Sequence, residues 1–191
     1  ELHRGRLLIH GDDPGRIALV AARIFGIVEV AICQQISPDL REIGDTAIQM
    51  AEKRLSKGAR FAVRARRQGV SGITSQEIAA HVGSVLRNAY PLSSVDLSTP
   101  EYEVFIEMRD FGALVYDTPI PAPKGLPWGT QGRVLSLLSA GIDSPVAAWL
   151  MMKRGCEVTS LHIDGGIYAG RDVRVTAERH HAILSGWCSG F

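Results

Sequence analysis

The sequence predicts an α/β protein made of consecutive strand and helix segments. Residues 1–37 read as strand–helix–strand, residues 38–117 as a compact set of helices and strands, and residues 132–191 open as strand–loop–helix–strand. Prolines and glycines cluster over residues 118–131 and predict a linker. Hydrophobic residues make up 46% of the chain and charged residues 21%, which is ordinary for a globular protein.

Composition also excludes several classes of protein. No run approaches the roughly 18–20 apolar residues that cross a bilayer, and the first residues do not resemble a signal peptide. The three cysteines, Cys33, Cys156 and Cys188, are widely spaced, which argues for a reducing compartment. His180 and His181 point about 100° apart on a helix, which disfavours a zinc site. We therefore expect a cytoplasmic protein with no membrane partner.

Residues 1–37 are predicted to be the second half of a small α/β domain. Residues 6–10 read as a short strand, and residues 17–25 as a helix that Gly26 ends. Residues 27–33 then read as a second strand. Two strands rarely form a stable sheet by themselves, so we expect partners outside this segment.

Residues 38–117 carry stronger local signals. Ser37 is predicted to cap a helix that Pro38 opens and Gly58 ends. Thr74 and Glu77 have the form of a capping box, which predicts the start of a second helix. Alternating apolar and polar residues predict strands over residues 61–66, 102–109 and 113–116.

Seven basic residues and no acid lie between Lys53 and Gln76, although the net charge of the whole chain is +1. Such a run is often only a solvated face. Arg64 and Arg66, however, share one face of a predicted strand and could meet successive phosphates. Such contacts position RNA without reading its sequence, so we predict salt-dependent binding by shape and backbone. The predicted RNA-binding residues are Lys57, Arg60, Arg64, Arg66 and Arg67.

A strand–loop–helix–strand unit follows the linker. The apolar run at 134–138 predicts a buried parallel strand, residues 145–154 a helix and residues 158–163 another strand. Between the first strand and the helix, residues 139–144 are small, so their amides can face a ligand. The helix N-terminus adds roughly half a positive charge, and together these features bind phosphate. A plain Ser/Gly turn with helix caps is the alternative.

Three side chains of this loop have predicted roles. Ser139 and Ser144 can donate hydroxyl hydrogen bonds, and Ser144 is also placed to cap the helix. Asp143 repels phosphate, so it either caps the helix or holds a Mg²⁺ ion that bridges phosphates. The loop is not a Walker loop, because no GKS/T follows it.

The run SAGIDSPVA at residues 139–147 resembles the SGGxDS "PP-loop" of ATP pyrophosphatases, in the form found in tRNA 4-thiouridine synthetases. Residues 125–134 resemble the linker of that family, and residues 61–78 resemble its THUMP domain. Residues 1–37 look like the second half of its ferredoxin-like domain. The resemblance implies an α+β ferredoxin-like and THUMP part followed by the start of a Rossmann-like PP-loop parallel sheet over residues 132–191.

The resemblance also implies a reaction and its participants. Members of the family use ATP and Mg²⁺ to adenylate uridine O4 in tRNA, and a persulfide sulfur then replaces that oxygen. Asp143 and Ser144 would be catalytic, with Asp143 as the Mg²⁺ ligand. Partners would be tRNA and a persulfide donor such as a cysteine desulfurase, and a homodimer is allowed. The positions that would contact ATP are Leu137, Leu138, Ser139, Gly141, Asp143, Ser144, His162 and Ile163.

The chain departs from the family pattern in two respects. Ala140 replaces the first loop glycine, and if that position needs a positive φ, alanine costs about 1 kcal/mol and weakens ATP binding. The chain also stops at Phe191, so we expect a truncated PP-loop domain without the family's catalytic cysteine. Two alternatives stay open: a non-catalytic THUMP module that holds tRNA, and another PP-loop ATP pyrophosphatase.

Overall fold

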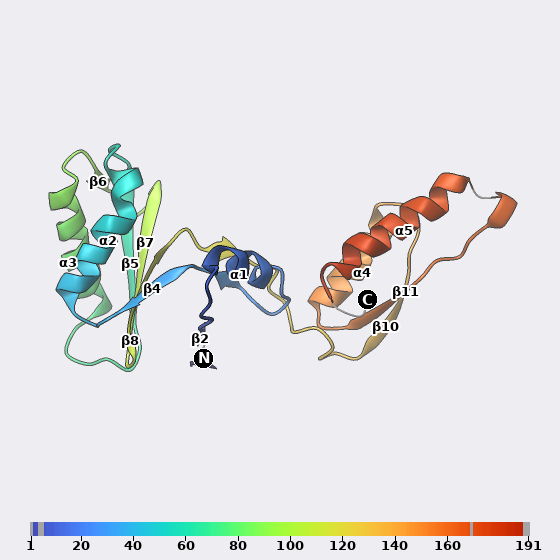
Figure 1. Cartoon of the computed structure of the whole chain (residues 1–191), viewed down its shortest axis with the longest axis horizontal. Coiled ribbons are helices and arrows are strands. Elements are labelled where there is room, and N and C mark those ends of the chain that lie inside the picture. Colours follow the sequence, from blue (N-terminus) through green and yellow to red (C-terminus); the bar gives the residue numbers. More distant parts are fainter. Residues whose placement is uncertain (1, 4–5, 169, 189–191) are drawn as a thin grey trace. The chain divides into compact units, whose positions relative to one another are not determined.

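A computed structural model describes residues 2–3, 6–168 and 170–188. The chain divides into two compact units (Figure 1). One unit is Ala31–Pro119. The other combines Glu1–Val30 with Ile120–Phe191. The mixed α/β class predicted from the sequence is confirmed.

The unit Ala31–Pro119 is a five-stranded sheet with two helices along one face (Figure 1). The strand order is β4-β8-β7-β5-β6, in which β5 runs parallel to β6 and β7, while β8 is antiparallel to β7 and β4. The elements are β4 Cys33–Ile36, α2 Leu40–Leu55, β5 Arg60–Arg67, α3 Ser75–Ala89, β6 Ser94–Val95, β7 Tyr102–Arg109 and β8 Gly112–Asp117.

The helices of this unit begin where side chains satisfy their free amides. Asp39 caps α2, because its Oδ1 accepts from the Arg41 and Glu42 amides at 2.9 and 3.1 Å. The predicted cap at Ser37 is therefore wrong by two residues. At α3 the predicted capping box is confirmed: the Glu77 amide donates to Thr74 Oγ1 at 3.2 Å, and the Thr74 amide donates to Glu77 Oε2 at 2.7 Å.

The core of this unit lies between the helices and one sheet face. Alternate residues of β7 point into it, as the sequence pattern predicted. Ile43, Phe61, Ile78, Leu86 and Ile106 have no exposed surface, so truncating any of them to alanine would cost several kcal/mol, about 2–5 for the aliphatic ones. This packing fixes the face of β5 from which Arg60, Arg64 and Arg66 project.

The strand predicted at residues 27–33 is wrong. Two short strands occur instead: β3 Glu29–Val30 pairs with β9 Ile120–Pro121, and β4 pairs with β8. Because β4 belongs to the five-stranded sheet, that unit begins at Ala31, seven residues before the predicted boundary at 38. The strand at residues 6–10 is also shorter than predicted, at β2 Arg6–Leu7, which pairs with β1 Leu2–His3.

The other unit contains the predicted strand–loop–helix–strand. Its strands β10 Arg133–Leu137 and β11 Glu157–Leu161 are parallel and in register, and α4 Asp143–Lys153 connects them. Apolar residues of α4, β11 and other segments of this unit form its core, including Phe25, Ala148, Met152, Val158 and Leu184. The remaining helical elements are α1 Pro14–Ala21, η1 Gly166–Tyr168 and α5 Arg171–Ser185.

Phe25 joins the N-terminal segment to this core. Its ring lies 5.4 Å from Trp149 and 5.7 Å from Trp187, and those two indole rings are 5.4 Å apart. The Arg23 guanidinium sits 5.0 Å over the Trp187 ring. Such aromatic pairs are worth roughly 0.5–1.5 kcal/mol beyond their buried area. The segment after α1 is therefore packed against α4 and the end of α5.

The predicted linker 118–131 is largely hydrogen-bonded. It contains β9, and beyond it the Lys124 amide donates to the Ile27 carbonyl at 2.8 Å. The Leu126 amide donates to the Lys153 carbonyl at 3.0 Å. Gly125 has a φ of +84°, and a Cβ there would collide with the same Lys153 carbonyl, so only glycine fits. This stretch is tied to β3 and to the end of α4.

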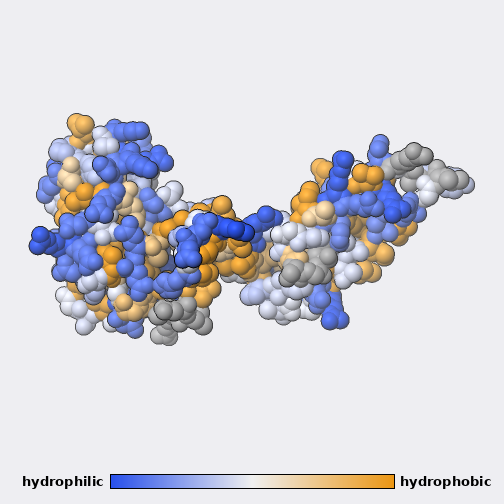
Figure 2. Space-filling view, in the orientation of Figure 1, coloured by the Kyte–Doolittle hydropathy of each residue, from blue (hydrophilic) through white to orange (hydrophobic). Residues whose placement is uncertain are grey.

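The prediction that strand 134–138 is buried is wrong. In β10, Leu135 and Leu137 are 63% and 64% exposed, because their face of the two-stranded sheet has no cover among the described residues. Figure 2 shows other apolar residues at the surface as well. Among the described residues, none of the helices is both long enough and apolar enough to span a bilayer.

Candidate functional site

The loop of residues 139–144 closes on itself through its two serines. The Ser139 amide donates to Ser144 Oγ at 2.9 Å, and the two hydroxyl oxygens lie 3.0 Å apart. The Gly141 amide donates to Ser139 Oγ at 3.2 Å. These bonds gather two hydroxyl groups between the carboxyl end of β10 and the first turn of α4.

The N-terminus of α4 has no side-chain cap. Its N-cap residue is Ile142, and the predicted cap at Ser144 is wrong because that hydroxyl faces Ser139 instead. The amides of the first helical turn therefore keep their capacity to bind an anion. Asp143 is exposed in the same turn and does not cap the helix. Its other predicted role, as a Mg²⁺ ligand, stays a prediction.

The oxygen-bearing side chains of the loop suit a Mg²⁺ ion that is bound partly by the protein and partly by the phosphates of a ligand. Among the described residues, no three His, Cys, Asp or Glu side chains cluster closely enough to hold a metal ion. Mg²⁺ is commonly bound by one or two carboxylates together with substrate phosphates and water. One exposed carboxylate, Asp143, beside the two hydroxyls suits that arrangement.

The residues predicted to contact the nucleotide differ in how exposed their side chains are. Leu137 and Ile163 are 64% and 75% exposed, whereas the Leu138 side chain is buried. His162 lies against Leu138, with its Nδ1 2.8 Å from the Leu138 carbonyl oxygen. Because a carbonyl only accepts, Nδ1 carries the proton. Within the described parts of the chain the buried His162 Nε2 has no partner.

A hollow of about 370 Å³ adjoins these residues. Its size falls in the range of small-molecule sites. It opens between the carboxyl end of β11 and the face of α5. The hollow is lined by Leu138, Ser160, His162, Asp164, Arg174, Ala177, Glu178 and His181.

Two residues of α5 that the sequence analysis considered only as zinc ligands contact this region. His180 Nδ1 lies 3.1 Å from the Ser139 carbonyl oxygen, and His181 Nδ1 lies 3.0 Å from Ser160 Oγ. Neither contact follows from local sequence, since 41 and 21 residues separate the partners. The only available signal was the spacing of Ala177 and Leu184, which predicts which face of the helix is inward.

Ala140 is accommodated without backbone strain. Within the described residues, positive φ outside glycine occurs only at Thr118 and Lys124. The loop position that Ala140 occupies therefore does not require glycine, and the expected cost of about 1 kcal/mol does not arise. Without that conformational cost, there is no reason to expect Ala140 to weaken ATP binding.

We expect Ala140→Gly to leave nucleotide affinity unchanged, within about twofold. Glycine has more conformational freedom in the unfolded chain, so the substitution should lower stability by about 0.4–1 kcal/mol. Calorimetric titration with ATP and thermal denaturation of the same preparations measure both quantities. A tenfold gain in affinity would show that Ala140 constrains the loop after all.

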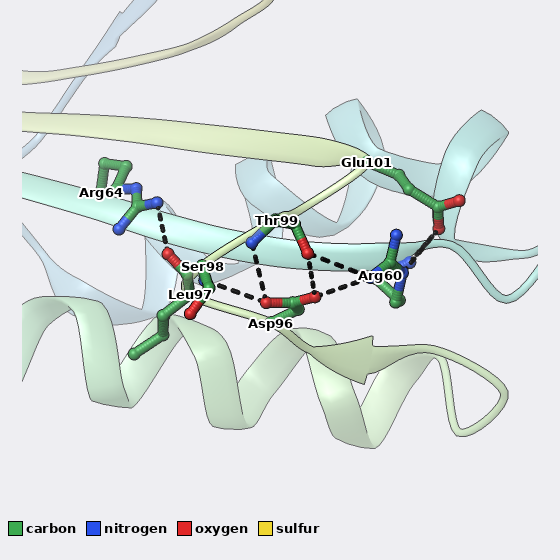
Figure 3. Close-up of polar contacts among 7 residues, drawn as sticks. All are labelled: Arg60, Arg64, Asp96, Leu97, Ser98, Thr99 and Glu101. Atoms are coloured by element: carbon green, nitrogen blue, oxygen red, sulfur yellow. Dashed lines mark hydrogen bonds and ion pairs between the residues drawn. The ribbon is translucent and has the colours of Figure 1, made fainter.

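The basic strand β5 is partly neutralised by acids outside the run. Arg60 pairs with Asp96 at 2.8 Å and with Glu101 at 3.6 Å (Figure 3). Arg64 pairs with Glu103 at 2.8 Å and donates to the Leu97 carbonyl at 2.9 Å. Two of the predicted RNA-binding residues are thus held by the strand β7 and the loop that precedes it.

That loop is organised by the Asp96 carboxylate. The Thr99 and Ser98 amides donate to it at 3.0 and 2.9 Å (Figure 3). These two hydrogen bonds, the Thr99 one foremost, hold the pKa of Asp96 below its usual range, and Arg60 adds to the effect. Because the folded-state pKa is lowered, the contribution of the carboxylate to stability is complete at neutral pH and is lost as the pH falls through that pKa.

The remaining predicted RNA-binding residues are arranged differently. Arg67 donates to the Val70 carbonyl at 2.6 Å. Lys57 and Arg66 are exposed. Arg64 and Arg66 both line one hollow of about 490 Å³. The local sequence contains no signal for the other residues of that hollow, which are Val63, Ala65, Ser75, Gln76, Ala79 and Phe105.

The cysteines are unsuited to nucleophilic chemistry. Cys156 and Cys188 are buried and free, and Cys33 is half-buried. Burial raises the pKa of the Cys33 and Cys188 thiols above the ordinary value. Since the thiolate is the reactive form, Cys33 and Cys188 are less reactive at neutral pH than an exposed cysteine.

Comparison with known proteins supports the two-unit organisation. A family model described as THUMP domain matches residues 37–117, and one described as Thiamine biosynthesis protein (ThiI) matches residues 129–190. A "Probable tRNA sulfurtransferase" of Methanothermobacter thermautotrophicus is 38% identical over 195 residues, covering 100% of this chain and 50% of the relative. A "tRNA sulfurtransferase" of Pyrobaculum aerophilum is 39% identical, covering 100% and 38%.

Two crystal structures are similar to the chain. PH1313 from Pyrococcus horikoshii has 31% identity and a TM-score of 0.81, covering 93% of this chain and 59% of that one. A 4-thiouridine synthetase–RNA complex with bound ATP has 27% identity and a TM-score of 0.82, covering 100% and 50%.

Fold, loop and matches together define a protein in which a THUMP domain is followed by a domain of the ThiI type. Over its whole length the chain is similar to curated tRNA sulfurtransferases. It spans about half the length of the curated relatives it matches.

Proposed function

We propose that this chain provides the tRNA-binding part and the first ATP-binding elements of an enzyme that makes 4-thiouridine in tRNA. The observation that carries the proposal is the serine-lined loop at the uncapped N-terminus of α4. That loop offers free helix amides and two hydroxyls to an anion. A solved relative of this fold is described as a 4-thiouridine synthetase–RNA complex with bound ATP.

In this proposal the loop holds the β- and γ-phosphates of ATP. The amides of the first turn of α4 and the hydroxyls of Ser139 and Ser144 donate to phosphate oxygens. Asp143 would hold Mg²⁺, which supplies positive charge against the phosphates. The nucleoside lies near Leu137, Leu138, His162 and Ile163, beside the hollow at the end of β11.

The reaction then proceeds in three steps. Uridine O4 attacks the α-phosphorus of ATP, the bond to the bridging oxygen breaks, pyrophosphate leaves with its electron pair, and uridine N3 loses its proton to solvent. Charge develops on that leaving group, so donors already aimed at it lower the barrier. The terminal sulfur of a persulfide next attacks C4 of the adenylated uridine, and AMP leaves. A second thiol of the donor protein then attacks the donor sulfur of the remaining S–S bond, which forms a disulfide on the donor and releases 4-thiouridine with N3 protonated again. The sulfur comes from a separate donor, such as a cysteine desulfurase, and none of the three cysteines is assigned to carry it.

Binding of tRNA is assigned to the hollow beside β5 and α3. Arg66 lines it and is exposed, and Ser75 and Gln76, in the first turn of α3, offer it a hydroxyl and a side-chain amide. Phe105 offers the same hollow an aromatic ring. Contacts of this kind position a phosphate backbone, so affinity should fall steeply as salt rises.

We expect Arg66→Gln to weaken tRNA binding more than Arg60→Gln. Arg66 is exposed, whereas the charge of Arg60 is already balanced by Asp96 and Glu101. Losing one phosphate contact should lower the slope of log affinity against log salt by about one. Filter binding or fluorescence anisotropy across a salt series measures it. Equal losses for the two variants would contradict the assignment of Arg66.

The reaction itself is tested with ATP, unmodified tRNA and a persulfide donor. Mass spectrometry of the digested tRNA should detect 4-thiouridine with the enzyme that contains this chain and none with the same enzyme carrying Asp143→Ala. Binding of tRNA without binding of ATP would instead support the non-catalytic THUMP module. Consumption of ATP on a small acceptor in the absence of tRNA would support another PP-loop ATP pyrophosphatase.

A further inference from the structure

His180 reaches the phosphate loop from a helix that lies 41 residues further along the chain. Its Nδ1 is 3.1 Å from the carbonyl oxygen of Ser139, the first residue of the loop. Because the carbonyl has no hydrogen to give, Nδ1–H is the donor, in both the neutral tautomer that carries it and the imidazolium. We propose that His180 is a positioning residue that orients the Ser139–Ala140 peptide for phosphate binding.

Peptide geometry connects this bond to the ligand. In a planar trans peptide the carbonyl and the following N–H point in opposite directions. Fixing the Ser139 carbonyl toward α5 therefore directs the Ala140 N–H in the opposite direction, away from α5. If the peptide turned over, a carbonyl oxygen would take the place of that donor and would repel phosphate.

Other groups in the loop do not hold the Ser139 carbonyl as well. Ser144 Oγ lies 3.3 Å from it and 3.4 Å from the Gly141 carbonyl, with Ser139 Oγ nearer at 3.0 Å. A hydroxyl has a single hydrogen, so it serves only one of these acceptors well at a time. The contact from His180 is shorter than the one from Ser144, and it comes from outside the loop.

The helix α5 holds His180 in place. Ala177 and Leu184, three residues before and four after it, are buried at 2% and 3% exposure. Residues at this spacing share one helix face, so His180 points inward and is half-buried. His181 bonds to Ser160 Oγ on β11 and so ties the same turn of α5 to the second strand.

The inference rests on the proposed phosphate-binding role of the loop, and a matched pair of substitutions tests it. His180→Asn keeps an N–H donor near the place of Nδ1, whereas His180→Leu removes it. Inorganic pyrophosphate and ATP serve as probes in calorimetric titrations of the whole chain. One hydrogen bond is worth about 1 kcal/mol, so His180→Leu should weaken both ligands by about five- to tenfold.

His180→Asn should bind both probes to within about threefold of the unmodified chain. Arg179→Leu, an exposed change on the same helix, should leave affinity unaltered. Equal affinity for His180→Leu and the unmodified chain would overturn the inference. So would a His180→Asn variant that keeps its circular dichroism spectrum and yet binds as poorly as His180→Leu.

A second readout needs no ligand and separates this inference from the proposed function. In NMR spectra of the free chain, His180→Leu should shift the Ser139 carbonyl and Ala140 amide signals, and His180→Asn should largely restore them. If the unmodified chain binds neither probe, the proposed function fails, while these signals still decide the role of His180. Unchanged signals in His180→Leu would overturn it.

Discussion

Ser144→Ala is expected to reduce the affinity of the chain for ATP by about ten- to a hundredfold. The Ser144 hydroxyl stabilises the conformation of the loop, because it accepts a hydrogen bond from the Ser139 amide at 2.9 Å. It is also one of two hydroxyls placed at the N-terminus of α4. A hydrogen bond to a charged group is worth about 1.5–3 kcal/mol, which corresponds to that range of affinity.

Calorimetric titration with ATP measures this loss. Ser185→Ala is the matched control, since Ser185 donates to the His181 carbonyl within α5 and lies outside the loop. The control should bind ATP as the unmodified chain does. Both variants should keep the far-ultraviolet circular dichroism of the unmodified chain. If Ser144→Ala binds ATP with unchanged affinity, phosphate does not lie where the proposed function places it.

Features that depend on neighbouring residues could be predicted from the sequence. The capping box of Thr74 and Glu77 is one such feature, because both partners lie in one turn. The alternation of β7 and the strand–loop–helix–strand around residues 139–144 are others. Each is decided by periodicity or by a side chain reaching a nearby amide, and each is found where it was predicted.

Features decided by distant partners could not be predicted in this way. Residues 27–33 have the composition of one strand, yet β3 and β4 pair with different partners about 80–90 residues away. The charge of Arg60 looks free in the sequence and is balanced by Asp96 and Glu101, 36 and 41 residues later. The bond from His180 to the Ser139 carbonyl belongs to the same class. Local pattern does not contain this information, since tertiary packing selects among alternatives that are locally equivalent.

The linker predicted over residues 118–131 differs from the structure for another reason. Proline and glycine within residues 118–131 correctly indicated irregular backbone, but irregular backbone need not be free. Amides of this stretch bond to Ile27, Lys153 and Gly155. Glycine is required at position 125 because a Cβ there would collide with the Lys153 carbonyl at the end of α4. The segment is therefore better described as a strap that connects β3 to the end of α4.

Arg109→Met is expected to lower the free energy of unfolding of the unit Ala31–Pro119 by about 3–5 kcal/mol. Arg109 pairs with Glu107 at 2.8 Å, and their side chains are only 11% and 3% exposed. Tyr116 also donates to Glu107, at 3.0 Å. Removing the guanidinium breaks the ion pair between Arg109 and a buried carboxylate, and breaking such a pair costs far more than the small net gain from forming it.

The double variant Glu107→Met with Arg109→Met should recover most of the lost stability, because both charges then leave the interior together. Arg87→Met, at an exposed position of α3, should change stability by less than about 0.5 kcal/mol. All three tryptophans lie in residues 128–187, so their fluorescence reports the other unit and should be unaffected. Urea denaturation followed by circular dichroism measures each variant. A double variant as unstable as Arg109→Met would show that these residues act through packing, and that the buried charge is not the cause.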